Sequence, residues 1–231
     1  MTNEKKAMEA QAHRGKDLSY LTVYPVDHQP DIQYPLIIML HGYGANMYDL
    51  ANLAGDIHTK GYLYVCPNAP LPVQAGPGAL GFAWNLPGST DDEQAKRSDL
   101  KLSNFLEEVL GEPGRDPKNC ILLGFSQGGG LTYRFGLPRP DRFAGLVALS
   151  CSMRDPENIK QTLPESRDQA IFIAHGTQDN PERAREAKDF LAGEGYSPVY
   201  KEYNMGHEIT PEVLDDLVPW IYRTLPPLGN V

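Results

Sequence analysis

The feature that most constrains the fold is a series of short apolar segments, separated by longer stretches with helical periodicity. Strands that are buried on both faces of a parallel sheet have such nearly continuous apolar sequences, because helices cover both faces. The apolar segments are residues 36–40, 62–66, 119–123, 146–149 and 170–174. We expect them to form the central strands of one sheet.

Two further strands are expected beside this set. Residues 18–24 alternate between apolar and polar side chains, which predicts a strand in an outer position, and residues 199–203 are expected to form the last strand. Helices are indicated where apolar residues recur three and four positions apart. These patterns cover residues 102–110, 131–137, 181–191 and 213–221, with a weaker one at 47–60. Strands that alternate with helices predict an α/β fold with a mostly parallel, doubly wound sheet.

The length of 231 residues favours one large domain. Residues 1–17 are polar and lack the apolar core of a secretory signal, so we expect a tail or a loose helical turn there, followed by a single domain at 18–231. The 30 acidic residues outnumber the 21 basic ones and give a formal net charge of −9. A negative surface repels nucleic acid and anionic lipid, although it also serves solubility alone.

Composition also argues against membrane insertion and against a bound metal. The longest aliphatic run, residues 36–40, is far shorter than the ~18 residues that a membrane span needs. The three cysteines are odd in number and lack the spacing of zinc ligands. This pattern predicts reduced thiols in a cytoplasmic protein rather than disulfides or a zinc site. We expect no metal and no cofactor.

Two long connections interrupt the alternation of strands and helices. Residues 67–89 are rich in Pro and Gly without periodicity, yet they carry apolar side chains. We interpret this segment as a loop that forms a wall or partial lid of a binding site. Leu80, Phe82 and Trp84 are its candidate substrate contacts. Residues 151–168 are more polar, and we expect plain surface there.

A GxSxG motif at residues 124–128 is the first chemical signal. A predicted buried strand precedes it and a predicted helix follows it, which is the setting of a nucleophile elbow. The two glycines leave room for a sharp turn that exposes the hydroxyl of Ser126 at the helix N-terminus. The alternative is a Gly-rich turn with an ordinary serine.

A serine hydroxyl needs a histidine base, which a carboxylate must orient. Two histidines follow Ser126. His207 follows the last predicted strand, and Asp179 stands in the turn after the strand before it, in the order that this type of sheet requires. His175 is the alternative base, but it would need an acid placed less convincingly at a strand end. Those acids are Asp141, Asp155 and Asp168. We prefer His207 as base and interpret His175 as a support for the acid turn.

The tetrahedral intermediate of such a reaction needs two N–H donors for its oxyanion. The backbone N–H of Gln127, directly after the serine, is one candidate. Tyr43 supplies the other, because it lies between Gly42 and Gly44 in a loop after a predicted central strand. The alternative for this loop is a Gly turn with a buried tyrosine, and we expect His41 to be structural.

Four segments together carry a family resemblance: HGYGAN at 41–46, GFSQGG at 124–129, HGTQD at 175–179 and MGHE at 205–208. Over about residues 18–225 the sequence resembles the phospholipase/carboxylesterase family of α/β hydrolases, which includes acyl-protein thioesterases and small bacterial carboxylesterases. The resemblance implies an α/β-hydrolase fold, the same roles for the residues above, and a place for Trp84 near the acyl pocket. The chain departs from the family pattern at residues 180–183 and at Cys151, which are expected to border the pocket.

These observations predict a serine carboxylesterase that hydrolyses short- to medium-chain acyl esters of small molecules through an acyl-enzyme. The chain leaves no room for a large cap domain, so we expect an open, shallow site. An acyl-thioesterase or a lysophospholipase could use the same residues, and a non-catalytic binding protein of this fold is a further alternative. The oligomeric state stays open, a homodimer included.

Overall fold

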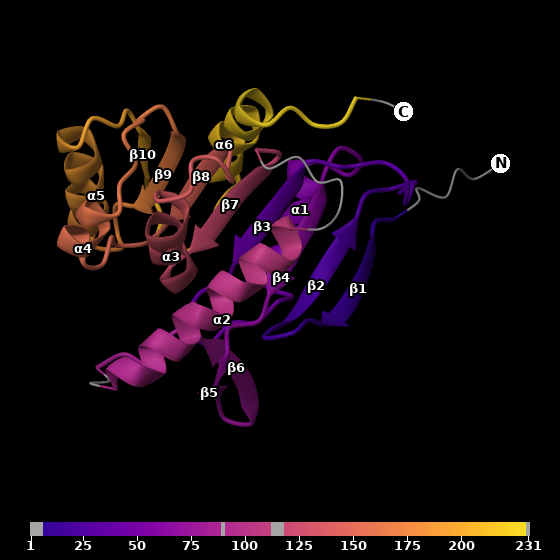
Figure 1. Cartoon of the computed structure of the whole chain (residues 1–231), viewed down its shortest axis with the longest axis horizontal. Helices are drawn as coiled ribbons and strands as arrows, with labels where there is room; N and C mark the ends of the chain where they lie inside the picture. Colours follow the sequence, from indigo (N-terminus) through magenta and orange to yellow (C-terminus); the bar gives the residue numbers. More distant parts are fainter. Residues whose placement is uncertain (1–6, 89–90, 112–117, 230–231) are drawn as a thin grey trace.

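An eight-stranded sheet forms the centre of the molecule in the described part of the chain (Figure 1). The structure is a computed structural model, and it describes residues 7–88, 91–111 and 118–229. The strand order is β1-β2-β4-β3-β7-β8-β9-β10. In chain order the strands are β1 Glu9–Arg14, β2 Ser19–Tyr24, β3 Leu36–Leu40, β4 Leu63–Pro67, β7 Cys120–Phe125, β8 Gly145–Leu149, β9 Ala170–Gly176 and β10 Val199–Tyr203. From β4 to β10 all pairs are parallel, whereas β2 pairs antiparallel with both β1 and β4.

Helices cover both faces of this sheet. They are a short 3₁₀ turn at Leu50–Asn52, α1 Leu53–Ile57, α2 Asp92–Leu110, α3 Gln127–Gly136, α4 Pro156–Gln161, α5 Glu182–Gly193 and α6 Pro211–Thr224. Ile38 and Leu40 of β3 pack in one core with side chains of α2 to α5. Ile37 and Met39 point the other way and pack with α1 and α6. Successive strand residues face opposite sides, so two buried faces explain the continuous apolar sequence of β3.

The predicted α/β fold with a doubly wound sheet is therefore confirmed, and the described chain contains no large cap domain.

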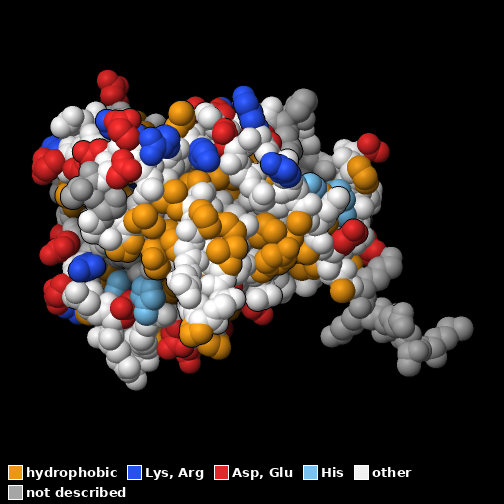
Figure 2. All heavy atoms as spheres, turned by 90° about the horizontal axis from the view of Figure 1, so that it is seen from below, with side chains coloured by type: hydrophobic (Ala, Val, Ile, Leu, Met, Phe, Trp, Pro, Cys, Tyr) orange, Lys and Arg blue, Asp and Glu red, His pale blue; other side chains and the backbone are white. Residues whose placement is uncertain are grey.

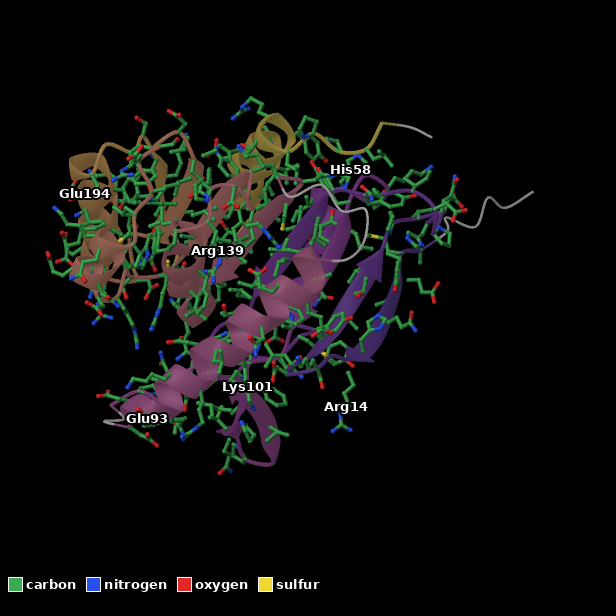
Figure 3. All side chains as sticks on the ribbon, in the orientation of Figure 1. Arg14, His58, Glu93, Lys101, Arg139 and Glu194 are labelled. Atoms are coloured by element: carbon green, nitrogen blue, oxygen red, sulfur yellow. The ribbon has the colours of Figure 1, made fainter. Side chains whose placement is uncertain are left out.

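Polar contacts join the helices on one face. Arg139, labelled in Figure 3, follows α3 and donates to the Phe135 carbonyl at 3.0 Å and to Ser103 Oγ of α2 at 3.1 Å. No helix within residues 7–88, 91–111 and 118–229 is long and apolar enough to cross a membrane.

The expectation of a tail or a loose helical turn before residue 18 is wrong for Glu9–Arg14. These residues form the edge strand β1, with Glu9 opposite Tyr24 and Arg14 opposite Ser19. Most of its side chains are exposed, so the strand is stabilised by backbone pairing and shows no apolar alternation. The strand predicted in an outer position at 18–24 is observed as β2, Ser19–Tyr24, second from the edge of the sheet. Residues 1–6 lie outside the described residues.

The loop predicted at 67–89 contains a β-hairpin, which is a second correction. Strands β5 Leu71–Gly76 and β6 Ala79–Ala83 form a two-stranded sheet of their own, visible at the bottom of Figure 1. Pro72, Gly76 and Gly81 lie within the strands and, together with an irregular register after Gln74, hide the alternation in the sequence. Residues 89–90 lie outside the described residues. The plain surface expected at 151–168 also needs correction, because α4 lies there and its surroundings line a cavity.

Candidate active site

Ser126 stands at the sharp turn between the end of β7 and the first residue of α3. Its backbone has φ 55° and ψ −115°, a conformation that costs energy for any residue with a side chain. The surrounding structure holds it there: the Ser126 N–H donates to the Leu149 carbonyl at 2.9 Å, and the Gly130 N–H donates to the Ser126 carbonyl at 3.2 Å. The turn places the hydroxyl at the carboxyl edge of the parallel strands.

The two motif glycines are sterically required. A Cβ on Gly124 would lie 2.2 Å from the carbonyl oxygen of Gly128. A Cβ on Gly128 would lie 2.1 Å from the carbonyl oxygen of Leu40, in the neighbouring strand. No other residue type fits at either position without moving backbone. The spacing of the motif thus follows from how closely α3 approaches β3 and β7.

Three polar side chains form a continuous chain of hydrogen bonds at this edge. Ser126 Oγ lies 2.8 Å from Nε2 of His207, and Nδ1 of His207 lies 2.6 Å from Oδ2 of Asp179. Asp179 stands in the turn after β9, and His207 follows β10, which pairs with β9. With Nδ1–H donating to the carboxylate, Nε2 is the lone-pair nitrogen that faces the serine hydroxyl. The structure thus brings together the three residues that the sequence pointed to.

His175, the alternative base, contacts the acid rather than the serine. Its side chain is buried, and Nε2–H donates to the main-chain carbonyl of Asp179 at 2.5 Å. The same nitrogen lies 3.4 Å from Oδ2 of Asp179. Of the acids weighed with it, Asp155 accepts from the Asn158 N–H and Asp168 from Ser166 Oγ. His175 therefore supports the acid turn, as expected.

Gln127 connects the serine turn to the segment after the hairpin. As the first residue of α3 its backbone N–H belongs to the turn whose donors have no acceptor within the helix. Its side chain accepts from the Trp84 N–H at 2.7 Å and donates to the Asn85 carbonyl at 2.9 Å and to Asn85 Oδ1 at 2.6 Å. The side chain is thus fixed, while the main-chain donor stands at the positive end of the helix.

The loop with Tyr43 lies directly against Ser126. A Cβ added to Gly42 would come within 3.2 Å of Ser126 Cβ. The Gly44 N–H donates to the Phe82 carbonyl at 2.9 Å, and the Phe82 N–H donates to the Ala45 carbonyl at 2.8 Å, so the hairpin holds this loop. The ring of Tyr43 is 47% exposed rather than buried. The two predicted backbone donors therefore stand on segments that flank the serine.

His41 is buried and structural. Its Nδ1–H donates to the Gly42 carbonyl at 2.7 Å, and Nε2 accepts from the Ala69 N–H at 3.0 Å. Burial lowers its pKa, so the neutral ring is favoured. These bonds fix the start of the Tyr43 loop.

The expected substrate contacts at Trp84, Leu80 and Phe82 need correction. Trp84 is 2% exposed, and its indole N–H donates to the His41 carbonyl at 2.9 Å. Phe82 packs against the core, and Leu80 is 67% exposed on the hairpin. Among the described residues that line the two cavities around Ser126, none of the three is found. Trp84 and Phe82 support the Tyr43 loop instead, through the bond to the His41 carbonyl and the backbone bonds of Phe82.

The first cavity, here named the arginine pocket, has a volume of about 250 Å³. Three basic side chains line it together with Ser126 and His207: Arg134, Arg154 and Arg183. Sequence reasoning missed the part of its wall that comes from residues 151–159. The sequence Asp155-Pro156 could have indicated it, because it is typical of a helix start and Asp155 does cap α4. Cys151 and residues 180 and 183, where the chain departs from the family pattern, line this pocket as expected.

The second cavity, here named the leucine pocket, has a volume of about 410 Å³ and lies on the other side of Ser126. Its apolar wall consists of Leu50, Leu53, Phe125 and Ile209. Figure 2 shows the molecule from the side toward which β3 and β7 point, and hydrophobic side chains form an interrupted band across this face. The serine hydroxyl thus stands between a basic and an apolar hollow.

A second potential nucleophile, Cys151, lines the arginine pocket. Burial raises the pKa of the Cys151 thiol to about 12, which keeps it protonated at neutral pH. Within the described ranges no group of three or more His, Cys, Asp or Glu side chains could hold a metal ion.

Comparisons with known proteins agree with the family resemblance and the fold. The sequence model of the phospholipase/carboxylesterase family matches residues 25–225. Acyl-protein thioesterase 1 of Kluyveromyces lactis is 30% identical over 213 residues, which are 82% of this chain and 92% of the relative. Carboxylesterase SOBER1 of Arabidopsis thaliana is 31% identical over 208 residues, 82% of this chain and 90% of the relative. The crystal structure of esterase PE8 has the same fold, with a TM-score of 0.74 at 23% identity over 90% of this chain and all of that one.

Proposed function

Because this chain belongs to the phospholipase/carboxylesterase family of α/β hydrolases, we propose that it is a serine hydrolase that cleaves carboxylic esters through an acyl-enzyme on Ser126. The observation that carries the proposal is the chain of hydrogen bonds from Ser126 through His207 to Asp179, with distances of 2.8 and 2.6 Å. Catalysis by an activated serine needs this arrangement of nucleophile, base and orienting acid.

The reaction proceeds in two acyl-transfer steps. His207 Nε2 takes the proton from Ser126 Oγ as the oxygen attacks the acyl carbon, and the imidazolium that forms is stabilised by Asp179. The oxyanion accepts hydrogen bonds from the backbone N–H groups of Tyr43 and Gln127. The intermediate collapses, the alcohol leaves with the proton from His207, and water then attacks the acyl-enzyme with His207 again as base. Water gives one proton to His207 as it attacks, His207 passes this proton to Ser126 Oγ as the acyl–oxygen bond breaks, and the carboxylic acid is released with the serine restored.

The proposed substrates have short to medium acyl chains. The apolar side chains of Leu50, Leu53 and Ile209 offer the leucine pocket as a place for an alkyl group. At about 250 and 410 Å³, both cavities are at or near the lower end of the range for ligand pockets. Hydrolysis rates that rise steadily through long aryl esters, without a short-chain optimum, would contradict this preference.

An acyl-thioesterase is the second candidate, because several relatives are named acyl-protein thioesterases and the attack on the acyl carbon is the same. A lysophospholipase would also use the same residues. A matched panel of p-nitrophenyl esters, acyl-thioesters and lysophospholipids separates the three classes, with Ser126→Ala as control. Turnover retained by Ser126→Ala would overturn the mechanism, and failure of an organophosphate to label Ser126 would favour a non-catalytic binding protein.

The proposal needs no cofactor and places the enzyme in the cytoplasm, acting on small molecules rather than nucleic acid. Cys66, Cys120 and Cys151 are all buried, and reduced thiols are typical of the cytoplasm. The net charge of −9 disfavours a nucleic acid partner.

A further inference from the structure

The two cavities that meet at Ser126 differ in charge. The wall of the arginine pocket has three guanidinium groups against the two carboxylates of Asp155 and Asp179. The wall of the leucine pocket has Asp49 and Glu208 and no Lys or Arg among its described residues. An anionic group on a substrate would be attracted on one side of the serine and repelled on the other. The charge pattern therefore distinguishes the two ends of a substrate.

The three arginines reach the arginine pocket from separate parts of the chain. Arg134 belongs to α3, Arg154 to the loop between β8 and α4, and Arg183 to α5. These elements follow three different strands, and the fold brings them together at the carboxyl edge of the sheet. Three like charges that converge on one hollow repel each other unless an anion lies between them.

The ion pairs of these arginines differ. Arg134 Nη2 lies 2.5 Å from Oδ2 of Asp99, so its charge is balanced by α2. Arg154 has a weaker contact with a neutral partner, Asn85 Oδ1, at 3.4 Å. In the part of the chain that the structure describes, neither Arg154 nor Arg183 pairs with a carboxylate.

Arg185, two residues after Arg183 in α5, is paired with carboxylates and serves as a comparison. It lies 2.5 Å from Glu182 and 2.7 Å from Glu202, outside the pocket wall. Acidic residues are in excess, with 30 against 21 basic residues, so carboxylate partners are abundant in this chain. Arg154 and Arg183 form no such ion pair among the described residues, and they line a cavity that Ser126 also lines.

The carboxylates within the arginine pocket are engaged elsewhere. Asp179 is bonded to His207 at 2.6 Å, and Asp155 accepts from the Asn158 N–H at the start of α4. Asp155 and Asp179 keep their negative charges, so with Arg134 paired to Asp99, Arg154 and Arg183 are the pocket's arginines without an ion pair among the described residues. A guanidinium fork matches the geometry of a carboxylate or a phosphate.

We propose that the preferred substrate is an ester that carries an anionic group, a carboxylate or a phosphate, and that Arg154 and Arg183 bind this group in the arginine pocket while the apolar half lies in the leucine pocket. The inference rests on the proposed role of Ser126 as nucleophile. The overall charge of −9 repels anions, so a preference for them has to come from these local arginines.

Paired substrates test this inference. Monomethyl adipate and dimethyl adipate share the scissile methyl ester, but only the first carries a carboxylate, on the acyl side. In the second pair, the butanoate ester of 2-hydroxyethyl phosphate carries a phosphate on the alcohol side. The monobutanoate ester of ethylene glycol is its neutral counterpart. For each pair, the ratio of kcat/KM for the anionic over the neutral ester is measured in the wild-type protein, in Arg154→Gln/Arg183→Gln, and in Arg223→Gln. Arg223, an exposed arginine in the last turn of α6, is the matched control.

We expect the wild-type protein to prefer the anionic ester of at least one pair by about tenfold, since charge-assisted hydrogen bonds contribute on this scale. The double variant should lower this ratio to about one, and Arg223→Gln should keep the wild-type ratio. The pair that shows the preference identifies which half of the substrate carries the anion. Calorimetry of adipate and inorganic phosphate with Ser126→Ala should show tighter binding of one anion than with the triple variant that also lacks both arginines.

Equal turnover of both esters in each pair, or a ratio that the double variant leaves unchanged, would overturn the anion preference and leave the esterase proposal intact. Turnover of these esters by Ser126→Ala would instead overturn the role of the serine on which the inference rests.

Discussion

The Nε2–H of His175 donates to the main-chain carbonyl of Asp179 at 2.5 Å, while the side chain of Asp179 accepts from His207 at 2.6 Å. His175 therefore holds the backbone of Asp179 in place, and His207 is hydrogen-bonded to the carboxylate of the same residue. His175 is the next-to-last residue of the buried strand β9, and its side chain is 3% exposed. The acid turn is therefore anchored to the core of the sheet.

His175 is a positioning residue in this arrangement, and its loss should reduce catalysis without removing it. We expect His175→Phe to lower kcat by about 10- to 100-fold, because small displacements of catalytic groups have effects of this size. His175→Gln, which can still donate from its amide, should recover part of the loss. His28→Ala, at a ring that makes tilted contacts with Tyr24 and Tyr34, serves as control. Steady-state kinetics on one aryl ester decides, and a changed KM with unchanged kcat would contradict the positioning role.

Gly128, in the serine turn, should be essential for stability. In Gly128→Ala the new Cβ would lie 2.1 Å from the Leu40 carbonyl oxygen, so backbone must move in a fully buried strand. We expect the free energy of unfolding to fall by roughly 3 kcal/mol or more. Gly55→Ala in α1 is the control, because nothing lies within 4 Å of its added Cβ and alanine favours helices. Urea denaturation measures both, and equal stability of the two variants would refute the steric argument.

Much of this site could be predicted from the sequence, because the residues that carry it follow strands buried on both faces. Such strands have a continuous apolar sequence, and parallel strands place their carboxyl ends at one edge. The proximity of Ser126, Asp179 and His207 could therefore be predicted from the sequence. Strand β1 could not be predicted, because Glu9–Arg14 contributes backbone pairing and no apolar face.

The cavity walls were harder to predict than the reacting groups. Trp84 has the size of a substrate contact, but its indole N–H is bonded inside the structure, and no sequence pattern specifies that partner. Arg154 and Arg183 lie at exposed loop and helix positions, where a charged residue is ordinary in any soluble chain. Only their convergence on the same cavity gives them significance, and convergence depends on tertiary packing.

The side chain of Gln127 should stabilise the segment that follows the hairpin, at Trp84 and Asn85. It accepts from the backbone N–H of Trp84 and donates twice to Asn85. Gln127→Ala removes all three bonds and leaves Asn85 Oδ1 with its 3.4 Å contact to Arg154. We expect the free energy of unfolding to fall by about 1–3 kcal/mol. Gln11→Ala, at an exposed position of β1, should change it by less than about 0.5 kcal/mol. Thermal unfolding of both variants tests this, and a Gln127→Ala protein as stable as Gln11→Ala would show that the bonds do not hold the segment.

The buried His41 predicts a loss of stability in mild acid. Burial lowers its pKa from the ordinary 6.5, and its bond to the Gly42 carbonyl opposes this only in part. Below pH 6.5 the unfolded chain therefore takes up a proton more readily than the folded protein does. The stabilisation is complete above that pH and is lost as the pH falls through the lowered value.

His28 and His58, whose pKa values burial also lowers, act in the same direction. Replacing His41 should thus remove part of the slope, not all of it. We expect the free energy of unfolding of the wild-type protein to fall between about pH 7 and pH 5, and that of His41→Gln to fall less steeply. Urea titrations at several pH values measure the two slopes. Parallel slopes would mean that His41 is not kept neutral by the fold, and the fixed Tyr43 loop would then need another explanation.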